Sequence, residues 1–311
     1  MELRSPDSRA QVVFRPECGG TVESLLLDAN GEPVEVLCPD PGDSGGDAAP
    51  GGCYDPTFAG RFLWPFNDRI PGGRYAFAGD SYQLPVNDPE TGDAIHGALY
   101  DRALTVEHEP RSASVVLHGA LEASELPGYP FSLAVMITLS IEPDSFFIAL
   151  STTNTGGRIA PIAFGWHPYF ALPGCESVDS MRLRTNAAHF IPVDDRLLPT
   201  GGPVPVAGTE LEPFVGSGPA STPIGDREFD VAVCGTGQPI ITELATATHR
   251  LVIHQSQAFT YQQWYTPPSR AAVAMEPITA ATDSFNRVET GRRLLGPGET
   301  LVGAVSVTLR Q

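Results

Sequence analysis

The chain has 311 residues, with 19 Lys+Arg and 37 Asp+Glu, which gives a formal net charge of −18. Every one of the basic residues is an arginine, so Schiff-base chemistry on a lysine and the lysine-containing phosphate-binding loop are both excluded. The strong negative charge also disfavours nucleic acid and anionic membrane surfaces as partners.

Gly and Pro separate short apolar runs along the whole chain. The sequence holds 32 Gly and 30 Pro, and 41% of its residues are hydrophobic, which is enough to bury a sizeable core. No segment longer than about ten residues shows a clean helical period. Short apolar runs bounded by turn residues are typical of an all-β protein.

The expected strands follow one another from the N-terminal region onward. Asn30-Gly31 stands between apolar residues 25–27 and 34–36 and predicts a hairpin turn. The clearest strand spans residues 131–141, where apolar side chains recur at every second position. Further strands are expected at residues 115–121, 146–152, 239–244, 251–254, 259–265, 271–275 and 301–309. This succession predicts a large antiparallel β-sandwich that forms a single domain over residues 1–311.

Two segments are rich in Gly, Pro and small polar residues. They span residues 39–52 and 200–221. Neither joins regions of different composition, so both are expected to be loops inserted into one domain.

The five cysteines are Cys18, Cys38, Cys53, Cys175 and Cys234. Their number is odd and no Cys-x-x-Cys pair occurs, so we expect reduced cysteines and neither a disulfide framework nor a zinc ribbon. The first residues lack the apolar core of a signal peptide, and no stretch approaches the roughly 20 apolar residues of a membrane span. A cytoplasmic location is therefore expected.

The sequence contains seven histidines. Four of them, His108, His118, His249 and His254, lie in or beside expected strands and are interpreted as structural or exposed. No pair has the spacing of two zinc ligands on one helix, so no metal site is predicted.

His167 stands out because aromatic residues surround it in the segment 164–170, among them Trp166 and Tyr169. Aromatic rings stack on the apolar faces of a sugar while polar groups reach its hydroxyls. The same segment also fits a core strand with a hydrogen-bonded histidine. From the residues alone, both interpretations remain open.

Glu276 ends the apolar run 271–275. Burying a carboxylate there costs free energy unless it is paired with another group or takes part in chemistry. A partly desolvated carboxylate also becomes more basic. It is a candidate general base, with an exposed carboxylate at a strand end as the alternative.

A third candidate region covers residues 60–73, 82–88 and 95–97. Here Arg69 and His96 are flanked by glycines, which allow tight turns and close approach of the backbone to a ligand.

Together these segments resemble the aldose 1-epimerase (galactose mutarotase) family. The match rests on Gly60-Arg61 with Asn67-Asp-Arg-Ile70, on Tyr82-Gln-Leu84 with Ile95-His-Gly97, on Trp166-His-Pro-Tyr-Phe170 and on Glu276-Pro-Ile-Thr-Ala280. Asp283-Ser-Phe-Asn286 and Leu295-Gly-Pro-Gly-Glu299 extend it toward the C-terminus. Four motifs in the same order at compatible spacing make a specific signal.

The resemblance implies a galactose mutarotase-like sandwich that interconverts the α and β anomers of a free aldohexose without a cofactor. Glu276 then resembles the base that takes the proton of the C1 hydroxyl, and His167 the acid that protonates the ring oxygen. Arg69, His96 and Asp230 resemble residues that bind the sugar. Trp166 and Tyr169 are the aromatic candidates for the same task.

Three alternatives stay open. A hexose-6-phosphate 1-epimerase would need a cationic cluster, for which Arg61, Arg69 and Arg74 lie close in sequence. A non-catalytic carbohydrate-binding protein would keep the aromatic residues without the acid and base. A glycoside hydrolase needs two carboxylates about the scissile bond and fits a His/Glu pair less well. Whether the chain forms a homodimer is left open as well.

Overall fold

The computed structural model describes residues 1–42, 52–53, 55–107 and 113–311. His108 and most of the expected loop 39–52 lie outside these ranges. Within them the regular secondary structure is almost entirely β-strand, the paired strands of the sheets are antiparallel, and the helices are single 3-10 turns of three residues each.

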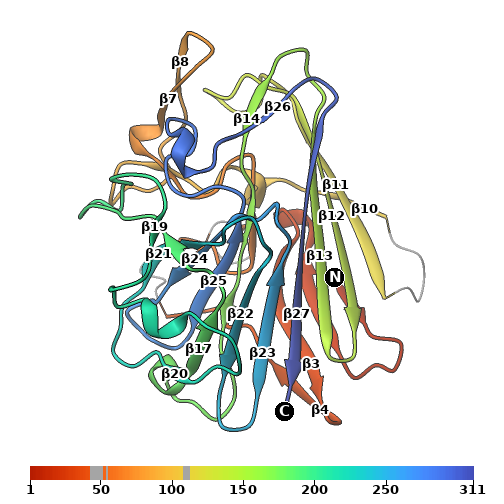
Figure 1. Cartoon of the computed structure of the whole chain (residues 1–311). Coiled ribbons are helices and arrows are strands. Elements are labelled where there is room, and N and C mark those ends of the chain that lie inside the picture. Colours follow the sequence, from red (N-terminus) through yellow and green to blue (C-terminus); the bar gives the residue numbers. More distant parts are fainter. Residues whose placement is uncertain (43–51, 54, 108–112) are drawn as a thin grey trace.

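Two large sheets form the body of the protein (Figure 1). The first sheet has nine strands in the order β10 (Thr105–Glu107), β11 (Ser114–Leu121), β12 (Leu133–Glu142), β13 (Ser145–Asn154), β27 (Thr300–Arg310), β23 (Arg250–Gln255), β22 (Ile240–Ala245), β17 (Arg182–Thr185) and β20 (Thr222–Pro223). The second has the order β19 (Val204–Pro205), β18 (His189–Phe190), β21 (Asp230–Cys234), β24 (Tyr261–Tyr265), β25 (Val273–Ile278), β15 (Gly165–His167) and β5 (Arg61–Leu63), with β16 (Tyr169–Phe170) also paired to β25.

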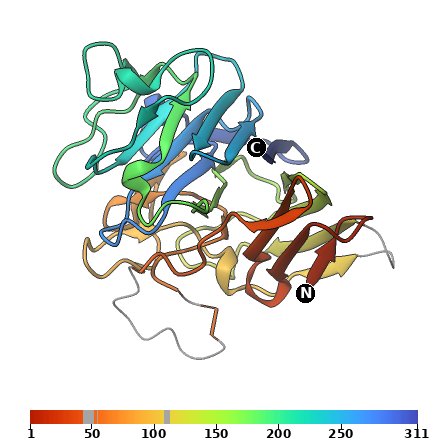
Figure 2. The same cartoon turned by 90° about the horizontal axis from the view of Figure 1, so that it is seen from below.

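Smaller elements complete the fold. A four-stranded sheet contains β1 (Glu2–Arg4), β2 (Gln11–Arg15), β3 (Thr21–Ala29) and β4 (Glu32–Glu35). The two-stranded pairs are β14 (Ala160–Ile162) with β26 (Arg293–Leu295), β6 (Arg69–Ile70) with β9 (Ala94–Ile95), and β7 (Arg74–Phe77) with β8 (Asp80–Gln83). The 3-10 turns are η1 (Pro16–Cys18), η2 (Pro71–Gly73), η3 (Leu99–Asp101), η4 (Val178–Ser180), η5 (Glu212–Phe214) and η6 (Val288–Thr290). Seen from below, the N-terminal strands lie beside the nine-stranded sheet (Figure 2).

The all-β prediction is confirmed, and each strand expected from the sequence is present with ends shifted by a few residues. The clearest expected strand is β12, in which every second side chain is buried. The hairpin at Asn30-Gly31 joins β3 to β4, and both residues have positive φ (53° and 95°), as the tight turn of a twisted hairpin requires. One strand end differs in a way that matters for the site. Strand β25 continues through Glu276 to Ile278, so this carboxylate lies inside a buried strand.

The two large sheets pack face to face around one apolar core, which makes the fold a β-sandwich. The ring of Phe146 on β13 contacts the indole of Trp166 on β15, with ring centroids 6.1 Å apart. The indole Nε1 of Trp64 donates a hydrogen bond to Thr152 Oγ1 on β13 at 2.9 Å. These contacts fix how the sheet that carries the site sits on the rest of the molecule.

Buried polar groups in the same core bond to each other across the sandwich. Thr242 on β22 donates to the amide oxygen of Gln262 on β24 at 2.6 Å, and Trp264 Nε1 donates to that oxygen at 2.8 Å. The amide nitrogen of Gln262 donates to Gln255 on β23 at 3.1 Å. A fully bonded network of this kind fixes the relative position of the two sheets better than apolar contact alone.

The segment 200–221, expected as a loop, contains the short strand β19 and the turn η5. Its anchor is Phe214, which is fully buried and packs edge-on against Phe229 and Trp264, with ring centroids 5.5 and 6.2 Å away. Val206, Leu211 and Ala220 of the same segment are buried as well, so several apolar side chains hold it against the core.

The expectation of reduced cysteines is wrong for two of the five. Cys18 and Cys53 form a disulfide, with their Cα atoms 5.1 Å apart, while Cys38, Cys175 and Cys234 are free. No sequence motif marks this pair, because the two cysteines meet only through the tertiary fold. The cytoplasmic location, which rested in part on reduced cysteines, stays a prediction.

Candidate active site

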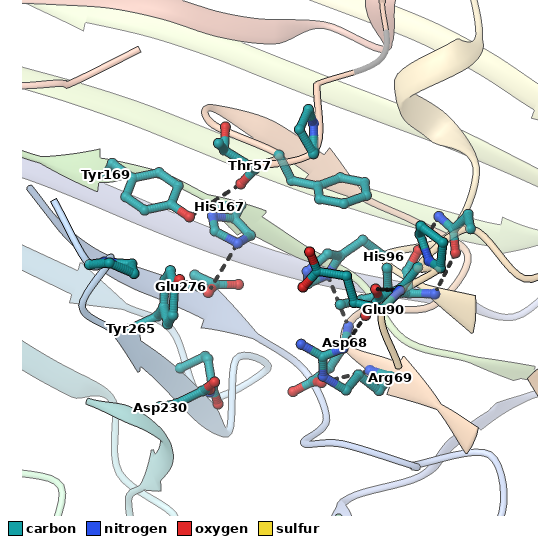
Figure 3. A pocket seen from close by; sticks show the side chains of 18 residues that line it. Thr57, Asp68, Arg69, Glu90, His96, His167, Tyr169, Asp230, Tyr265 and Glu276 are labelled. Carbon is teal, nitrogen blue, oxygen red and sulfur yellow. Dashed lines mark hydrogen bonds and ion pairs between the residues drawn. The ribbon is translucent and has the colours of Figure 1, made fainter. Parts of the chain in front are cut away.

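An open cavity of about 620 Å³ lies against the eight-stranded sheet, on the face that points away from the core. Six of the seven predicted site residues line it: Arg69, His96, His167, Tyr169, Asp230 and Glu276. Figure 3 shows them on two walls, with His167, Tyr169, Asp230 and Glu276 on the sheet and Arg69 and His96 opposite. The structure thus brings together residues from four separate sequence segments.

Strand register explains the sheet wall. Glu276 on β25 is paired with Gln263 on β24, and Asp230 on β21 is paired with Tyr265 on β24. Paired residues and residues two apart share one face of a sheet, so all four side chains point into the cavity. The intervening residues of these strands point into the core instead.

The imidazole of His167 and the carboxylate of Glu276 are in direct contact. Nε2 of His167 lies 3.3 Å from Oε1 of Glu276, and the two side chains are 6% and 3% exposed. Burial raises the pKa of Glu276 well above its ordinary value, and the charges of Asp68 and Asp230 add to this rise while that of Arg69 opposes it. Burial lowers the pKa of His167 to about 3. An exposed carboxylate at this position is excluded.

These two pKa shifts have one consequence for the pair. Between the lowered pKa of His167 and the raised pKa of Glu276, the two groups together hold a single proton. One partner is then protonated and the other can accept a proton, and the contact allows the proton to sit on either. The pair can therefore act as one acid and one base at the same time.

His96 lies on the opposite wall, directly after β9, and its tautomer is set by the backbone. The N–H of Asp68 donates to Nδ1 of His96 at 3.2 Å, so in the neutral ring the proton is on Nε2. Burial, followed by the charges of His167 and Arg69, lowers the pKa of His96 well below its ordinary value. His96 is thus a neutral hydrogen-bond donor in the cavity wall.

Arg69 begins β6, which pairs with β9 and so places Arg69 next to His96. Its guanidinium forms an ion pair with Asp88 and donates to the hydroxyl of Thr91 at 3.4 Å. These bonds hold one side of the planar group, and the cavity-facing N–H groups remain suited to ligand oxygens.

Asp230 is partly buried, and the amide of Gln263 donates to its Oδ1 at 2.7 Å. Burial and then the charge of Asp68 raise the pKa of Asp230 to about 6, against the opposing effect of Arg69. The carboxylate changes its charge within a range that solution experiments reach easily.

Aromatic side chains close one end of the cavity. Tyr169 stacks on the imidazole of His167, with centroids 5.1 Å apart, and its hydroxyl donates to the carbonyl of Thr57 at 3.2 Å. Phe58 meets the ring of His96 edge-on at 4.7 Å. These rings hold both histidines in place and give the cavity an apolar wall.

Trp166 does not line the cavity, in contrast to the prediction. Its indole is 1% exposed, lies among Phe146 and Phe170 in the core, and donates from Nε1 to the carbonyl of Gly60 at 3.2 Å. Neighbouring residues of a strand point to opposite faces, so Trp166 and His167 cannot both face the same ligand.

Sequence reasoning missed several residues of the cavity. Asp68, Asp88, Gln263 and Tyr265 line it without having been proposed. A signal existed for each pair: Asp68 lies within a matched motif and Asp88 ends the candidate segment 82–88, and Gln263 and Tyr265 are two apart in an expected strand. Only the strand register shows that the latter two face Glu276.

Among the described residues, no group of three or more His, Cys, Asp or Glu side chains is placed to hold a metal ion. No helix in that part of the chain is long and apolar enough to cross a membrane.

A β-sandwich with a buried acid–base pair, a guanidinium and aromatic rings in one open cavity defines a protein suited to a small polyhydroxylated ligand. Comparison with known families narrows this class. The aldose 1-epimerase family model matches residues 5–308, and the chain belongs to this family.

Proteins of similar sequence match part of the chain. The uncharacterized protein YihR of Escherichia coli (strain K12) is 34% identical over 142 residues, which is 45% of this chain and 45% of YihR. Galactose mutarotase of Mus musculus is 28% identical over 149 residues, or 47% of this chain and 42% of that protein. The matches thus span less than half the length of these relatives.

Solved structures agree over the whole chain and show the fold. A GalM/aldose epimerase homologue from C. elegans superimposes with a TM-score of 0.79 at 18% identity, covering 99% of this chain and 98% of the other. Galactose 1-epimerase from Lactobacillus acidophilus NCFM gives a TM-score of 0.73 at 19% identity, covering 97% and 92%. The galactose mutarotase-like sandwich predicted from the motifs is confirmed.

Proposed function

We propose that this protein is an aldose 1-epimerase that interconverts the α and β anomers of a free aldohexose. The observation that carries the proposal is the contact between His167 and Glu276, 3.3 Å apart in the wall of an open cavity. Mutarotation needs one proton removed and one delivered on the same sugar, which is the chemistry of such a pair.

The raised pKa of Glu276 and the lowered pKa of His167 put the shared proton on Glu276 in the free protein. The proposed reaction begins when this proton moves across the contact to His167, which gives the pair the form His167-H⁺ and Glu276⁻. Glu276 takes the proton of the C1 hydroxyl while His167 gives its proton to the ring oxygen, and the bond between C1 and that oxygen breaks. Rotation about the C1–C2 bond then exposes the other face of the aldehyde. The reverse proton transfers close the ring to the other anomer and restore the pair.

The remaining residues are assigned to sugar binding. His96 presents its Nε2–H to the ring oxygen, and Arg69 donates to hydroxyl oxygens. Asp230 accepts from sugar hydroxyls through a charge-assisted hydrogen bond. Tyr169 offers its ring to an apolar face of the pyranose.

No cofactor is required by this proposal. Mutarotation already proceeds slowly in water, and a positioned acid and base supply roughly 10²–10⁴ in rate. Fixing both groups about the sugar adds an effective-concentration gain. We therefore assign the protein to the cofactor-independent isomerases.

Charge in the cavity favours a neutral sugar over a sugar phosphate. Five carboxylates line the cavity, namely Asp68, Asp88, Glu90, Asp230 and Glu276, against one guanidinium, that of Arg69. The other two arginines considered for phosphate lie elsewhere: Arg61 bonds Thr21 in the interior, and Arg74 bonds Gln83 on the β7–β8 hairpin. A phosphate dianion would meet net repulsion here.

The test is polarimetry of freshly dissolved α-glucose and α-galactose with the protein, with glucose 6-phosphate in parallel. The proposal expects the approach to anomeric equilibrium to accelerate with at least one free sugar. Acceleration with glucose 6-phosphate alone would select the phosphate epimerase. Binding of sugars without acceleration of any would indicate a carbohydrate-binding protein.

Three further assignments stay predictions alongside this proposal. They are a single-domain organisation over residues 1–311, a cytoplasmic location, and the open question of a homodimer.

A further inference from the structure

Asp68 is a buried carboxylate for which the proposed reaction has no use. It is 8% exposed and lines the same cavity as Glu276. Its Oδ1 accepts from the backbone N–H of Arg69 at 2.6 Å, and its Oδ2 accepts from the hydroxyl of Thr282 at 2.8 Å. A buried carboxylate is costly, so its presence beside a general base calls for a reason.

The backbone of Asp68 holds His96 from two sides. Its N–H donates to Nδ1 of the imidazole at 3.2 Å, and its carbonyl accepts from the backbone N–H of His96 at 3.3 Å. Asp68 and His96 have φ values of 59° and 61°, in the left-handed region that side chains other than glycine rarely occupy. Such strained residues persist only where the surroundings fix them, and here each fixes the other.

Burial raises the pKa of Asp68, and the charge of Arg69 opposes this rise without forming an ion pair with Asp68. The guanidinium of Arg69 makes its ion pair with Asp88, on the outer side of the cavity. The donors that bond the carboxylate of Asp68 are a backbone N–H and a hydroxyl, both neutral. Its field therefore extends into the cavity, where burial limits screening by water.

Glu276 faces charged and titratable groups from every neighbouring element. These are His167 on β15, Tyr169 on β16, Asp230 on β21, Tyr265 on β24, Asp68 and Arg69 at β6, and His96 after β9. After burial, the charge of Asp68 is the first cause that raises the pKa of Glu276. The charge of Asp68 also raises the pKa of Asp230.

We propose that Asp68 is a positioning residue for this site: its backbone sets the tautomer of His96, and its charge sets the upper end of the pH range over which His167 and Glu276 share one proton. The inference rests on the proposed function for its kinetic readout. A negative charge near the pair favours the state that keeps the shared proton, so removing that charge must move the alkaline limb of the pH profile toward lower pH. The acid limb should stay in place, because burial raises the pKa of Asp68 and leaves it neutral at the low pH where His167 takes up a second proton.

The test is Asp68→Asn, which removes the charge and keeps the backbone donor to His96 and an acceptor for the N–H of Arg69. We expect the alkaline limb of the plot of kcat against pH to move to lower pH by on the order of one unit. This limb reports loss of the pair's single proton, which the charge of Asp68 opposes.

Two further variants separate charge from shape. Glu142→Gln is the control, because Glu142 is exposed at the end of β12 and does not line the cavity, so it should leave both limbs in place. Thr282→Val removes a donor to charged Asp68 and so favours its protonation. It should move the alkaline limb in the same direction as Asp68→Asn by a smaller amount, and it decides the matter where Asp68→Asn does not fold.

A lower kcat in Asp68→Asn with the alkaline limb unmoved would mean a purely structural role and would overturn the proposal. So would an unchanged profile. Failure of the proposed function is distinguishable, because the wild-type protein would then accelerate no sugar. In that case the carboxyl carbon resonance of Glu276, assigned by its loss in Glu276→Gln, is titrated by NMR. Its midpoint should still lie at lower pH in Asp68→Asn than in wild type, and equal midpoints would overturn the proposal.

Discussion

Nε2 of His167 lies 3.3 Å from Oε1 of Glu276, although the two residues belong to different strands, β15 and β25. Both side chains are nearly buried, and the cavity in front of them is open. The fold thus brings together two side chains that belong to two separate sequence motifs, residues 166–170 and 276–280.

Glu276→Gln should lower the rate of anomer interconversion by at least about a hundredfold, because the amide cannot accept the C1 hydroxyl proton. Sugar binding should remain detectable by calorimetry, since the amide keeps the size and hydrogen-bonding capacity of the side chain. Polarimetry measures the rate.

Glu142→Gln is the matched control for this change, because Glu142 is exposed at the end of β12. It should leave the rate at the wild-type value. A rate of Glu276→Gln close to wild type would remove the assignment of the base.

The pH dependence of the proposed reaction should divide between KM and kcat. Asp230 has a pKa raised to about 6, so it becomes neutral as the pH falls through that value. A neutral carboxyl loses its charge-assisted bond to a sugar hydroxyl, and KM should rise about fivefold from pH 8 to pH 5, as roughly 1 kcal/mol implies. The pair of His167 and Glu276 keeps its single proton over this range, so kcat should stay level.

Asp230→Asn should have a raised KM that no longer depends on pH. Asp226→Asn, at an exposed position nearby, should behave as wild type. A wild-type KM that stays constant over the same pH range would contradict the role given to Asp230.

Much of the fold could be predicted because strands with one buried face show a regular alternation of apolar and polar residues in the sequence. In β12 the buried residues alternate strictly, so a period of two reveals the strand and its inner face. The place of Glu276 in its strand was harder to predict, because β25 is buried at all of its residues and shows no alternation that would locate its end. Motif resemblance identified the residue, and the structure corrected its place within the strand.

The features that could not be predicted from the sequence depend on contacts between distant segments. Trp166 was assigned to the site because aromatic residues cluster around His167, but strand geometry sends it into the core. Asp68 and His96 adopt positive φ values that no local sequence pattern predicts. The pairing of Cys18 with Cys53 likewise follows only from the fold.

Trp166→Phe should reduce stability without impairing catalysis. The change removes the hydrogen bond to Gly60 and leaves a void beside Phe146, at a cost of about 1–3 kcal/mol in the free energy of unfolding. Urea unfolding measures this cost. Because the indole is outside the cavity, kcat/KM should remain within about twofold of wild type.

Tyr169→Leu is the comparison, because Tyr169 stacks on His167 from within the cavity. It should raise KM severalfold through loss of the aromatic face. A larger loss of kcat/KM in Trp166→Phe than in Tyr169→Leu would return Trp166 to the site.

The disulfide between Cys18 and Cys53 should be both measurable and stabilising. Of the five cysteines three are free, so the unfolded protein without reductant should titrate three thiols, and five after reduction. The bond closes a loop with a sequence separation of 35, for which chain entropy in the unfolded state gives about 3–4 kcal/mol. Replacing both residues by Ala should lower the free energy of unfolding by up to this amount, and added dithiothreitol should then have no further effect.

The same double variant should also raise KM, because the chain runs from Cys53 to Thr57 and Phe58 in the cavity wall. If that wall becomes less rigid, the hydrogen bond from Tyr169 to Thr57 and the ring contact between Phe58 and His96 weaken. We therefore expect a larger effect on KM than on kcat. Cys175→Ala serves as the control, since Cys175 is free and lies apart from the cavity. Five reactive thiols in the unfolded wild-type protein without reductant would refute the disulfide, and an unchanged KM in the double variant would show that the wall holds without it.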